Sequence, residues 1–101
     1  MLSKILIKRR FNKGNTREIV ALLNEIRYKA MEQPGYISGI TLSSREDPQS
    51  MLVIGTWQNM EDWLNWKDNQ TRKDLESMLA IYSAAPTHYE EYVVGTSFQQ
   101  S

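Results

Sequence analysis

The chain has 101 residues, with twelve basic and twelve acidic side chains, so its formal net charge at pH 7 is zero. A balanced charge offers no basic surface of the kind that nucleic acid or an anionic membrane attracts, and we expect neither partner. The absence of cysteine excludes disulfides, thiolate metal sites and thiol chemistry. It also fits a reducing compartment, so we expect a cytoplasmic protein.

The length suits one domain, which we expect at residues 1–95, followed by a polar tail at 96–101. No stretch approaches the roughly 20 apolar residues of a membrane helix. The opening residues MLSKILIKRR carry their charge after a short apolar run, which is the reverse of the order in a secretory signal.

Residues 2–11 are predicted to form the first strand, because apolar side chains alternate between its two faces. One face carries Ile5 and Ile7, and the other carries Leu2 and Leu6. The strand ends in three basic residues that we expect at the solvent or at a pocket rim, namely Lys8, Arg9 and Arg10.

The first helix is predicted between Asn15 and Pro34. Asn15 and Glu18 resemble a capping box, and Pro34-Gly35 ends the helical pattern. Apolar residues repeat at helical spacing between these ends, at Ile19, Leu22, Leu23, Ile26 and Ala30.

The second strand is predicted at 36–44, and Gly39 within it indicates a bulge or a close approach of another group. Tyr36, Ile40 and Leu42 are expected on one face and Ile37, Gly39 and Thr41 on the other. The polar residues 45–49 then form a turn, so that the second and third strands make a hairpin.

The third strand, at 51–54, is an unbroken apolar run, Met-Leu-Val-Ile. A strand with one solvated face alternates apolar and polar residues, whereas this one needs apolar cover on both faces. We therefore expect it at the centre of the sheet.

A second helical region begins at Asn59, an N-cap residue, and its pattern breaks at Asp68-Asn69, so we expect it to be bent or split. The last strand is predicted at 87–95. His88, Tyr92 and Val94 are expected on one face, and Tyr89, Glu91 and Val93 on the other.

The order β-α-β-β-α-β predicts an α+β fold of the ferredoxin-like split type, a four-stranded antiparallel sheet with both helices on one face. The helices then cover only one side of a sheet whose central strand is apolar on both. We expect a second copy of the chain to cover the other side, as a homodimer that buries on the order of 2,000 Å² or more.

Several segments resemble the antibiotic biosynthesis monooxygenase-like family of dimeric α+β barrels, and the resemblance spans nearly the whole domain. They are Lys13-Gly14, Pro-Gly-Tyr-Ile-Ser at 34–38, and Thr56-Trp57 followed by Trp63 and Trp66. The resemblance implies an enzyme that inserts oxygen into a phenolic or quinol-like molecule without a metal or a flavin, or one of the haem-degrading monooxygenases.

The haem-degrading branch resembles this chain at one of three positions. Its members carry an Asn on the first strand, a Trp on the second helix and a His beyond that Trp. Aligned through Lys13-Gly14, Trp66 matches, whereas Ile7 stands at the Asn position and Leu75 or Glu76 at the His position. A haem iron would therefore lack its proximal ligand, and we do not expect haem degradation.

Trp63 and Trp66 lie three residues apart on one helix, and two indoles over the sheet suit a flat aromatic ligand. Ordinary core packing explains the same pattern. The resemblance favours Trp66 in particular, because its position matches the pocket wall of the family.

Histidine is the side-chain type that ionises near neutral pH, so His88 is the candidate general base for a phenolic proton. Arg10 or Lys8 are candidates to hold the resulting anion, and Tyr28, Tyr36 or Tyr92 to donate a hydrogen bond to it. Ordinary surface positions are the alternative for all of these residues.

The sequence therefore predicts a homodimeric, cofactor-independent monooxygenase for a small aromatic molecule, with His88 as catalytic residue and no metal site. Substrate binding is assigned to Trp66, Trp63, Arg10, Tyr28 and Tyr92. The alternative is a dimer of the same fold that binds a small ligand or serves as an interaction module, without catalysis.

Overall fold

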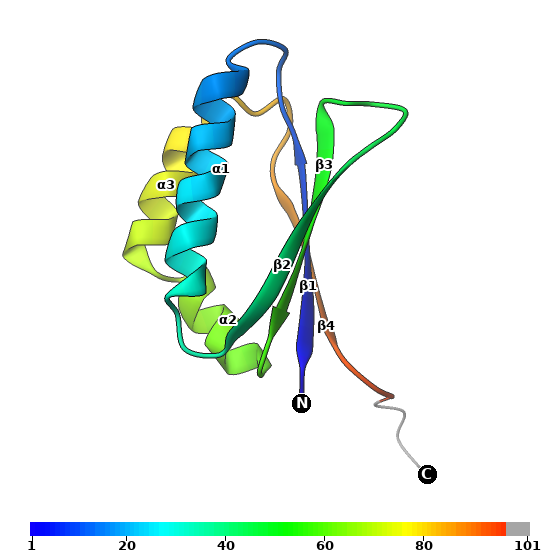
Figure 1. Cartoon of the computed structure of the whole chain (residues 1–101), viewed down its shortest axis with the longest axis vertical. Coiled ribbons are helices and arrows are strands. Elements are labelled where there is room, and N and C mark those ends of the chain that lie inside the picture. Colours follow the sequence, from blue (N-terminus) through cyan, green and yellow to red (C-terminus); the bar gives the residue numbers. More distant parts are fainter. Residues whose placement is uncertain (97–101) are drawn as a thin grey trace.

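The computed structural model describes residues 1–96, so the predicted tail at 96–101 lies outside the described residues except for Thr96. Four strands form one antiparallel sheet in the order β2-β3-β1-β4, and the helices all lie on one side of it (Figure 1). The elements in chain order are β1 (Ser3–Arg10), α1 (Thr16–Met31), β2 (Tyr36–Ser43), β3 (Ser50–Trp57), α2 (Met60–Lys67), α3 (Gln70–Ala80) and β4 (His88–Val93). The predicted ferredoxin-like α+β fold is confirmed.

The face of the sheet toward the helices is set by the alternation along β1. Ser3, Ile5, Ile7 and Arg9 are all buried there. Their antiparallel partners on β3 are Trp57, Gly55, Val53 and Met51, and directly opposed residues lie on the same face of a sheet. This helix face meets the buried residues of the helices to form the core, namely Ile19, Ile26, Ala30, Trp63, Trp66 and Leu79.

The third strand is longer than predicted, since β3 continues from Ile54 through Gly55 and Thr56 to Trp57. Its apolar run does divide as expected between the two faces of an inner strand. Met51 and Val53 lie on the helix face, whereas Leu52 and Ile54 lie on the other.

The prediction for Tyr36 is wrong. The register between β2 and β3 shifts between Tyr36 and Ser38, and such a bulge turns the residues before it to the opposite face. Tyr36 therefore points to the helix face, with Gly39 and Thr41. Its hydroxyl lies only 2.8 Å from where a Cβ of residue 39 would stand, so Gly39 marks the close approach that its position in the strand indicates.

The helix ends agree with the predictions in part. The side chains of Asn59 and Asn69 accept hydrogen bonds from the backbone N–H of Asp62 at 2.9 Å and of Arg72 at 3.2 Å, so the helical region is split as predicted and each half has its own cap. The predicted capping box at Asn15 is wrong. Asn15 has a left-handed backbone with φ of 57°, and its side chain makes no cap hydrogen bond.

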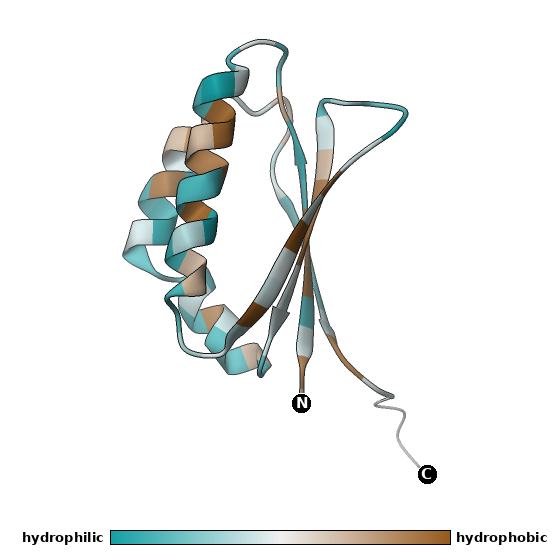
Figure 2. Ribbon diagram, viewed as in Figure 1, coloured by the Kyte–Doolittle hydropathy of each residue, from teal (hydrophilic) through white to brown (hydrophobic). Residues whose placement is uncertain are grey.

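The second face of the sheet has no helix over it, and we call it the open face. Its apolar side chains come from all four strands, and Ile40, Leu42 and Tyr92 are 53%, 42% and 52% exposed. They lie beside the half-buried Leu6, Leu52 and Ile54. Figure 2 shows hydrophobic segments along the ribbon of the sheet. Within the described part of the chain, no helix is long and apolar enough to cross a membrane.

Gly35, in the connection from α1 to β2, and Gly14, in the connection from β1 to α1, both have positive φ. Comparing them tests how tightly the connection from α1 to β2 is packed. Gly35 has φ of 82°, and a Cβ there would overlap the carboxylate of Asp62, whereas Gly14 has φ of 90° and open space around it. We expect Gly14→Ala to cost about 1 kcal/mol, the penalty for a side chain at positive φ. Gly35→Ala should cost more, because it adds the clash. Urea unfolding measures both, and equal losses would show that Asp62 yields without cost.

Candidate ligand-binding site

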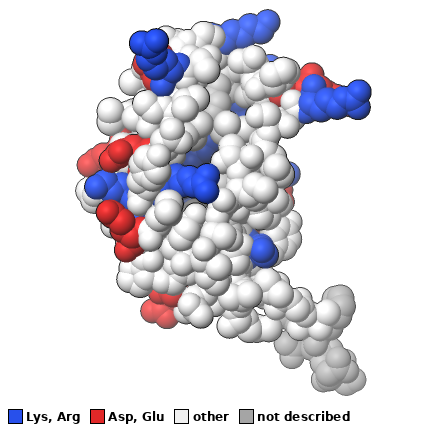
Figure 3. All heavy atoms as spheres, in the orientation of Figure 1, with Lys and Arg blue, Asp and Glu red and all other residues white. Residues whose placement is uncertain are grey.

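A cavity of about 300 Å³ lies between α1 and the helix face of the sheet. Its walls come from α1, from three strands and from both shorter helices, so residues far apart in the sequence meet there. Figure 3 shows basic side chains in the hollow between α1 and β2. The volume lies at the lower end of the range for small-molecule sites.

One wall of the cavity is aromatic. Trp57, Trp63 and Trp66 all line it, and each is at most 3% exposed. Tyr36 meets Trp57 edge to face at 5.3 Å between ring centroids, and Trp57 and Trp63 follow at 6.0 Å. Arranged in this way, the rings hold one another in place and make this wall of the cavity apolar.

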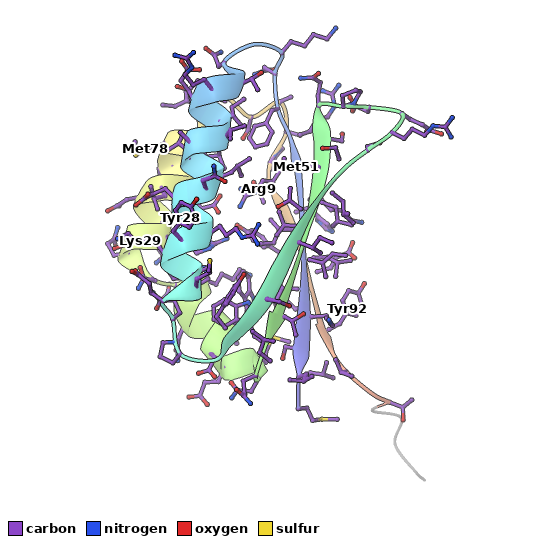
Figure 4. All side chains as sticks on the ribbon, viewed as in Figure 1. Arg9, Tyr28, Lys29, Met51, Met78 and Tyr92 are labelled. Atoms are coloured by element: carbon purple, nitrogen blue, oxygen red, sulfur yellow. The ribbon has the colours of Figure 1, made fainter. Side chains whose placement is uncertain are left out.

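Arg9 adds a positive charge to the lining of the same cavity. It is 5% exposed. Its Nη1 and Nη2 donate to Oε1 and Oε2 of Glu76 on α3, each at 2.7 Å. Figure 4 shows Arg9 between the helical layer and the sheet. This bidentate ion pair joins an inner strand to the helix that covers it.

Arg72, which is 4% exposed, is the second buried guanidinium of the cavity wall. Its Nη2 lies 3.1 Å from Oε2 of Glu76 and donates to the hydroxyl of Tyr89 at 2.8 Å. The guanidinium also lies 5.3 Å from the ring centroids of both Trp63 and Tyr89. Cation–π contact of this kind fixes the arginine beside the aromatic wall.

Glu76 is the carboxylate shared by the two arginines. Burial alone would raise its pKa, but the hydrogen bonds and charge of Arg9, together with the charge of Arg72, outweigh burial and hold the pKa below its usual value of 4.5. Glu76 is therefore ionised at neutral pH. Two cations share one anion in this wall.

The indole of Trp63 is oriented by a hydrogen bond to Glu91 on β4. Its Nε1 donates to Oε2 of Glu91 at 2.7 Å, and the ammonium of Lys67 reaches the same oxygen at 3.2 Å. These donors lower the pKa of Glu91, the Trp63 bond being the largest cause. The indole orientation is therefore set by a charged partner.

The predicted site residues separate into different places. Trp63 and Trp66 line the cavity as expected. His88, Arg10 and Tyr92 lie across the sheet from it, on the open face, because they share the strand phase of Lys8 and Lys4; Figure 4 shows Tyr92 on that side. The expectation that His88 and Trp66 share one cavity is therefore wrong for a single chain.

Tyr36, another candidate donor, lines the cavity, whereas the remaining predicted residues lie elsewhere. Tyr28 is 59% exposed on α1 and does not line the cavity. Lys8, Arg10 and His88 border a second hollow of about 520 Å³ on the open face. There Lys8 pairs with Glu90 at 2.9 Å and Arg10 with Asp47 at 2.9 Å, so these cations are neutralised by surface carboxylates.

Sequence reasoning did not assign Trp57, Arg27 or the two buried arginines, Arg9 and Arg72, to the cavity. A signal for Arg9 was present, because it continues the phase of Ile5 and Ile7 on a strand and so must share their buried face. A signal for Arg72 was present as well, because it lies three residues before Leu75 and seven before Leu79, which is helical spacing on one face.

Two further observations bear on cofactors. Among residues 1–96, no three His, Asp or Glu side chains gather closely enough to hold a metal ion. Glu76, one of the two residues aligned with the haem-ligating position, is held by two arginines. Both its oxygens are engaged by guanidinium groups, so the residues present do not fit a haem.

The chain belongs to the family described as antibiotic biosynthesis monooxygenase, whose model matches residues 3–77. This match agrees with the resemblance in the sequence and with the observed fold. Among curated protein sequences, none matches this chain.

Solved structures share the fold at low sequence identity. A conserved protein from Methanosarcina mazei Go1 is 13% identical, with a TM-score of 0.84 over 91% of each chain. SnoaB, a cofactor-independent oxygenase from Streptomyces nogalater, is 13% identical, with a TM-score of 0.79 over 99% of this chain and 100% of SnoaB. A candidate antibiotic biosynthesis monooxygenase from Nitrosomonas europaea is 14% identical, with a TM-score of 0.82 over 99% of this chain and 94% of its own.

The lowered pKa of Glu76 predicts acid sensitivity. A carboxylate whose pKa is lowered by folding stabilises the fold above its unfolded pKa, here about 4.5, and loses that contribution as the pH falls through the folded value. We expect Glu76→Gln to be less stable than wild type at pH 7 and to lose less stability on acidification below 4.5. Urea unfolding across this pH range measures both effects.

Asp68→Asn is the matched control. Asp68 also pairs with a cation, Lys73 at 2.7 Å, but its side chain is 82% exposed, and exposed pairs contribute little. If the two variants showed the same acid profile, the buried ion pair would not be the source of the acid sensitivity.

Proposed function

We propose that the chain is a monooxygenase that acts on a small aromatic, phenolic or quinol-like molecule bound in this cavity, without a cofactor of its own. Its family and its likeness in fold to SnoaB, a cofactor-independent oxygenase, support this function. The observation that carries it is the wall of Trp57, Trp63 and Trp66 around a cavity of about 300 Å³.

The reaction needs electrons, and in this proposal the substrate supplies them. A phenol that takes up one atom of O₂ at its ring becomes a quinone, while the second oxygen atom leaves as water with the two hydrogens that the phenol loses. The protein's share is to hold the ring, to favour its anion and to exclude bulk water. The tryptophans serve the first task and the buried arginines the second.

Non-catalytic binding of a small ligand is the second candidate function. Among the described residues that line the cavity there is no histidine, and Glu76, the carboxylate that joins Arg9 and Arg72, is held by both arginines. Glu76 is therefore not free to accept a proton from a substrate, which favours ligand binding without catalysis. Oxygen consumption separates the two candidates.

We also propose that the chain works as a homodimer joined through its open face. Ile40, Leu42 and Tyr92 expose apolar surface there beside the half-buried Leu52 and Ile54. Large exposed apolar patches mark interaction sites. A second sheet laid on this one would supply the cover that the central strand needs, over an area typical of a stable dimer.

Oxygen uptake with a panel of hydroquinones and naphthols tests the catalytic proposal. We expect uptake above the buffer rate that falls at least about tenfold in Trp66→Phe, because a smaller ring stacks less of the substrate and misplaces it. An oxygen electrode measures the rate, and each substrate in aerated buffer without protein gives the baseline.

His88→Ala is the informative companion variant in the same assay. Because His88 lies across the sheet from the cavity, we expect its rate to equal that of wild type. Uptake that matched the buffer rate for every substrate would favour ligand binding without catalysis, and a rate that fell with His88→Ala instead of Trp66→Phe would place the chemistry on the open face.

Ile40→Glu tests the dimer. A carboxylate at this 53% exposed position would have to be buried between two sheets, which is costly without a partner charge. We expect sedimentation to give a dimer for wild type and a folded monomer for the variant. Ile81→Glu is the control, since Ile81 is 75% exposed just beyond α3, away from the sheet; a wild-type monomer at micromolar concentration would overturn the proposal.

A further inference from the structure

The cavity wall holds more positive than negative charge. Arg9 and Arg72 are both more than nine-tenths buried, and the buried carboxylate between them is Glu76. Arg27, from α1, is exposed and adds a third guanidinium at the cavity lining, where it donates to the backbone oxygen of Gly39 at 3.4 Å. The buried surplus is therefore that of Arg9 and Arg72 over Glu76. Uncompensated charge away from water is unfavourable, so this arrangement calls for an anion.

The buried arginines also keep donors in reserve. Glu76 occupies the two terminal nitrogens of Arg9, whereas the Nε–H of Arg9 and that of Arg72 are buried without a hydrogen-bond partner among residues 1–96. The Nε–H and one remaining Nη–H form a second edge of a guanidinium, and this edge matches the two oxygens of a carboxylate. Buried donors of this kind are rarely left unsatisfied.

We propose that the cavity selects aromatic ligands that carry an acidic oxygen, a carboxylate or a phenolate, and that Arg9 and Arg72 bind this oxygen while Trp66 stacks on the ring. The inference rests on the proposed function of the cavity and names its substrate class. Arg27 at the lining of α1 attracts the same anions toward the cavity.

Charge balance is the reason for the selectivity. A neutral ring that enters the cavity leaves the surplus charge unpaired and both Nε–H groups unsatisfied, whereas an acidic ring pairs with the charge and accepts the hydrogen bonds. For a phenol, neighbouring cations favour the ionised form. The ligand therefore binds as the electron-rich anion, having released its proton to solvent, and needs no proton acceptor in the cavity.

Matched ligands of one shape test the proposal. Isothermal titration calorimetry would compare 1-naphthoate with 1-naphthylmethanol, which has the same ring and no charge. The absorbance of bound 1-naphthol at pH 7 reports whether a phenol binds as phenolate, and so separates the two acidic oxygens. We expect 1-naphthoate to bind roughly tenfold more tightly than the alcohol, the usual worth of a hydrogen bond to a charged group.

The variants should change this preference in opposite directions. Arg9→Met removes one cation and leaves Glu76 paired with Arg72, so the preference for the acid should disappear. Glu76→Gln frees both arginines, so the preference should rise above that of wild type. A merely structural ion pair would weaken all ligands alike in both variants. Arg45→Met, in the exposed loop between β2 and β3, should behave as wild type.

The outcomes also separate this inference from the function on which it rests. Equal binding of acid and alcohol, with both weakened in Trp66→Phe, would overturn the acid preference and leave an aromatic-binding cavity in place. Absence of binding by any of the naphthalenes would overturn both. Should Arg9→Met fail to fold, as circular dichroism would show, an unchanged preference in Glu76→Gln would still overturn the proposal.

Discussion

The ion pair between Arg9 and Glu76 is the constraint on which the site depends. It joins β1, an inner strand, to α3, and it lies between the helices and the sheet beside the apolar core. Removal of one partner from such a buried pair costs about 3–5 kcal/mol, because the other charge is left uncompensated. The pair therefore holds α3 at one position over the sheet, and this position brings Arg72 beside Trp63 and Tyr89.

The fold follows from patterns that the sequence displays openly. Period-two alternation in the strands and period-three-to-four repeats in the helices predict the element order, and the apolar run at 51–54 predicts the central strand. The prediction for Tyr36 is wrong because a bulge between it and Ser38 reverses the face to which the side chain points. A bulge is hard to recognise in a single sequence. Asn15 fits a capping pattern, but its left-handed backbone turns the side chain away from the helix end.

The sequence predicts two tryptophans of the cavity wall but not its buried arginines, and this difference has a physical cause. Trp63 and Trp66 point to the sheet because they belong to the apolar face of a short helix, a signal that residue type and spacing carry together. Arg9 is predicted at the solvent or at a pocket rim because a charged residue is rarely buried unless it is paired. The phase of Ile5 and Ile7 places it inside, and Glu76 supplies the pairing. Strand alternation also places Arg10 and His88 on the open face, because neighbouring residues of a strand point to opposite sides of the sheet. Their side chains therefore cannot reach the cavity.

The sheet separates the cavity on its helix face from the open face, and the fold alone does not show what either surface binds. Relatives of 13% identity share the backbone arrangement at TM-scores of 0.84 and 0.79, yet a fold common to many proteins hosts different chemistry. Specificity must therefore lie in side chains that line the cavity without being needed for the backbone arrangement. The tryptophans belong to the hydrophobic core. A guanidinium that has no carboxylate partner of its own, in contrast, adds nothing to packing that an apolar residue would not supply at a lower desolvation cost. The surplus charge is consequently the part of this cavity that is most directly explained by a ligand.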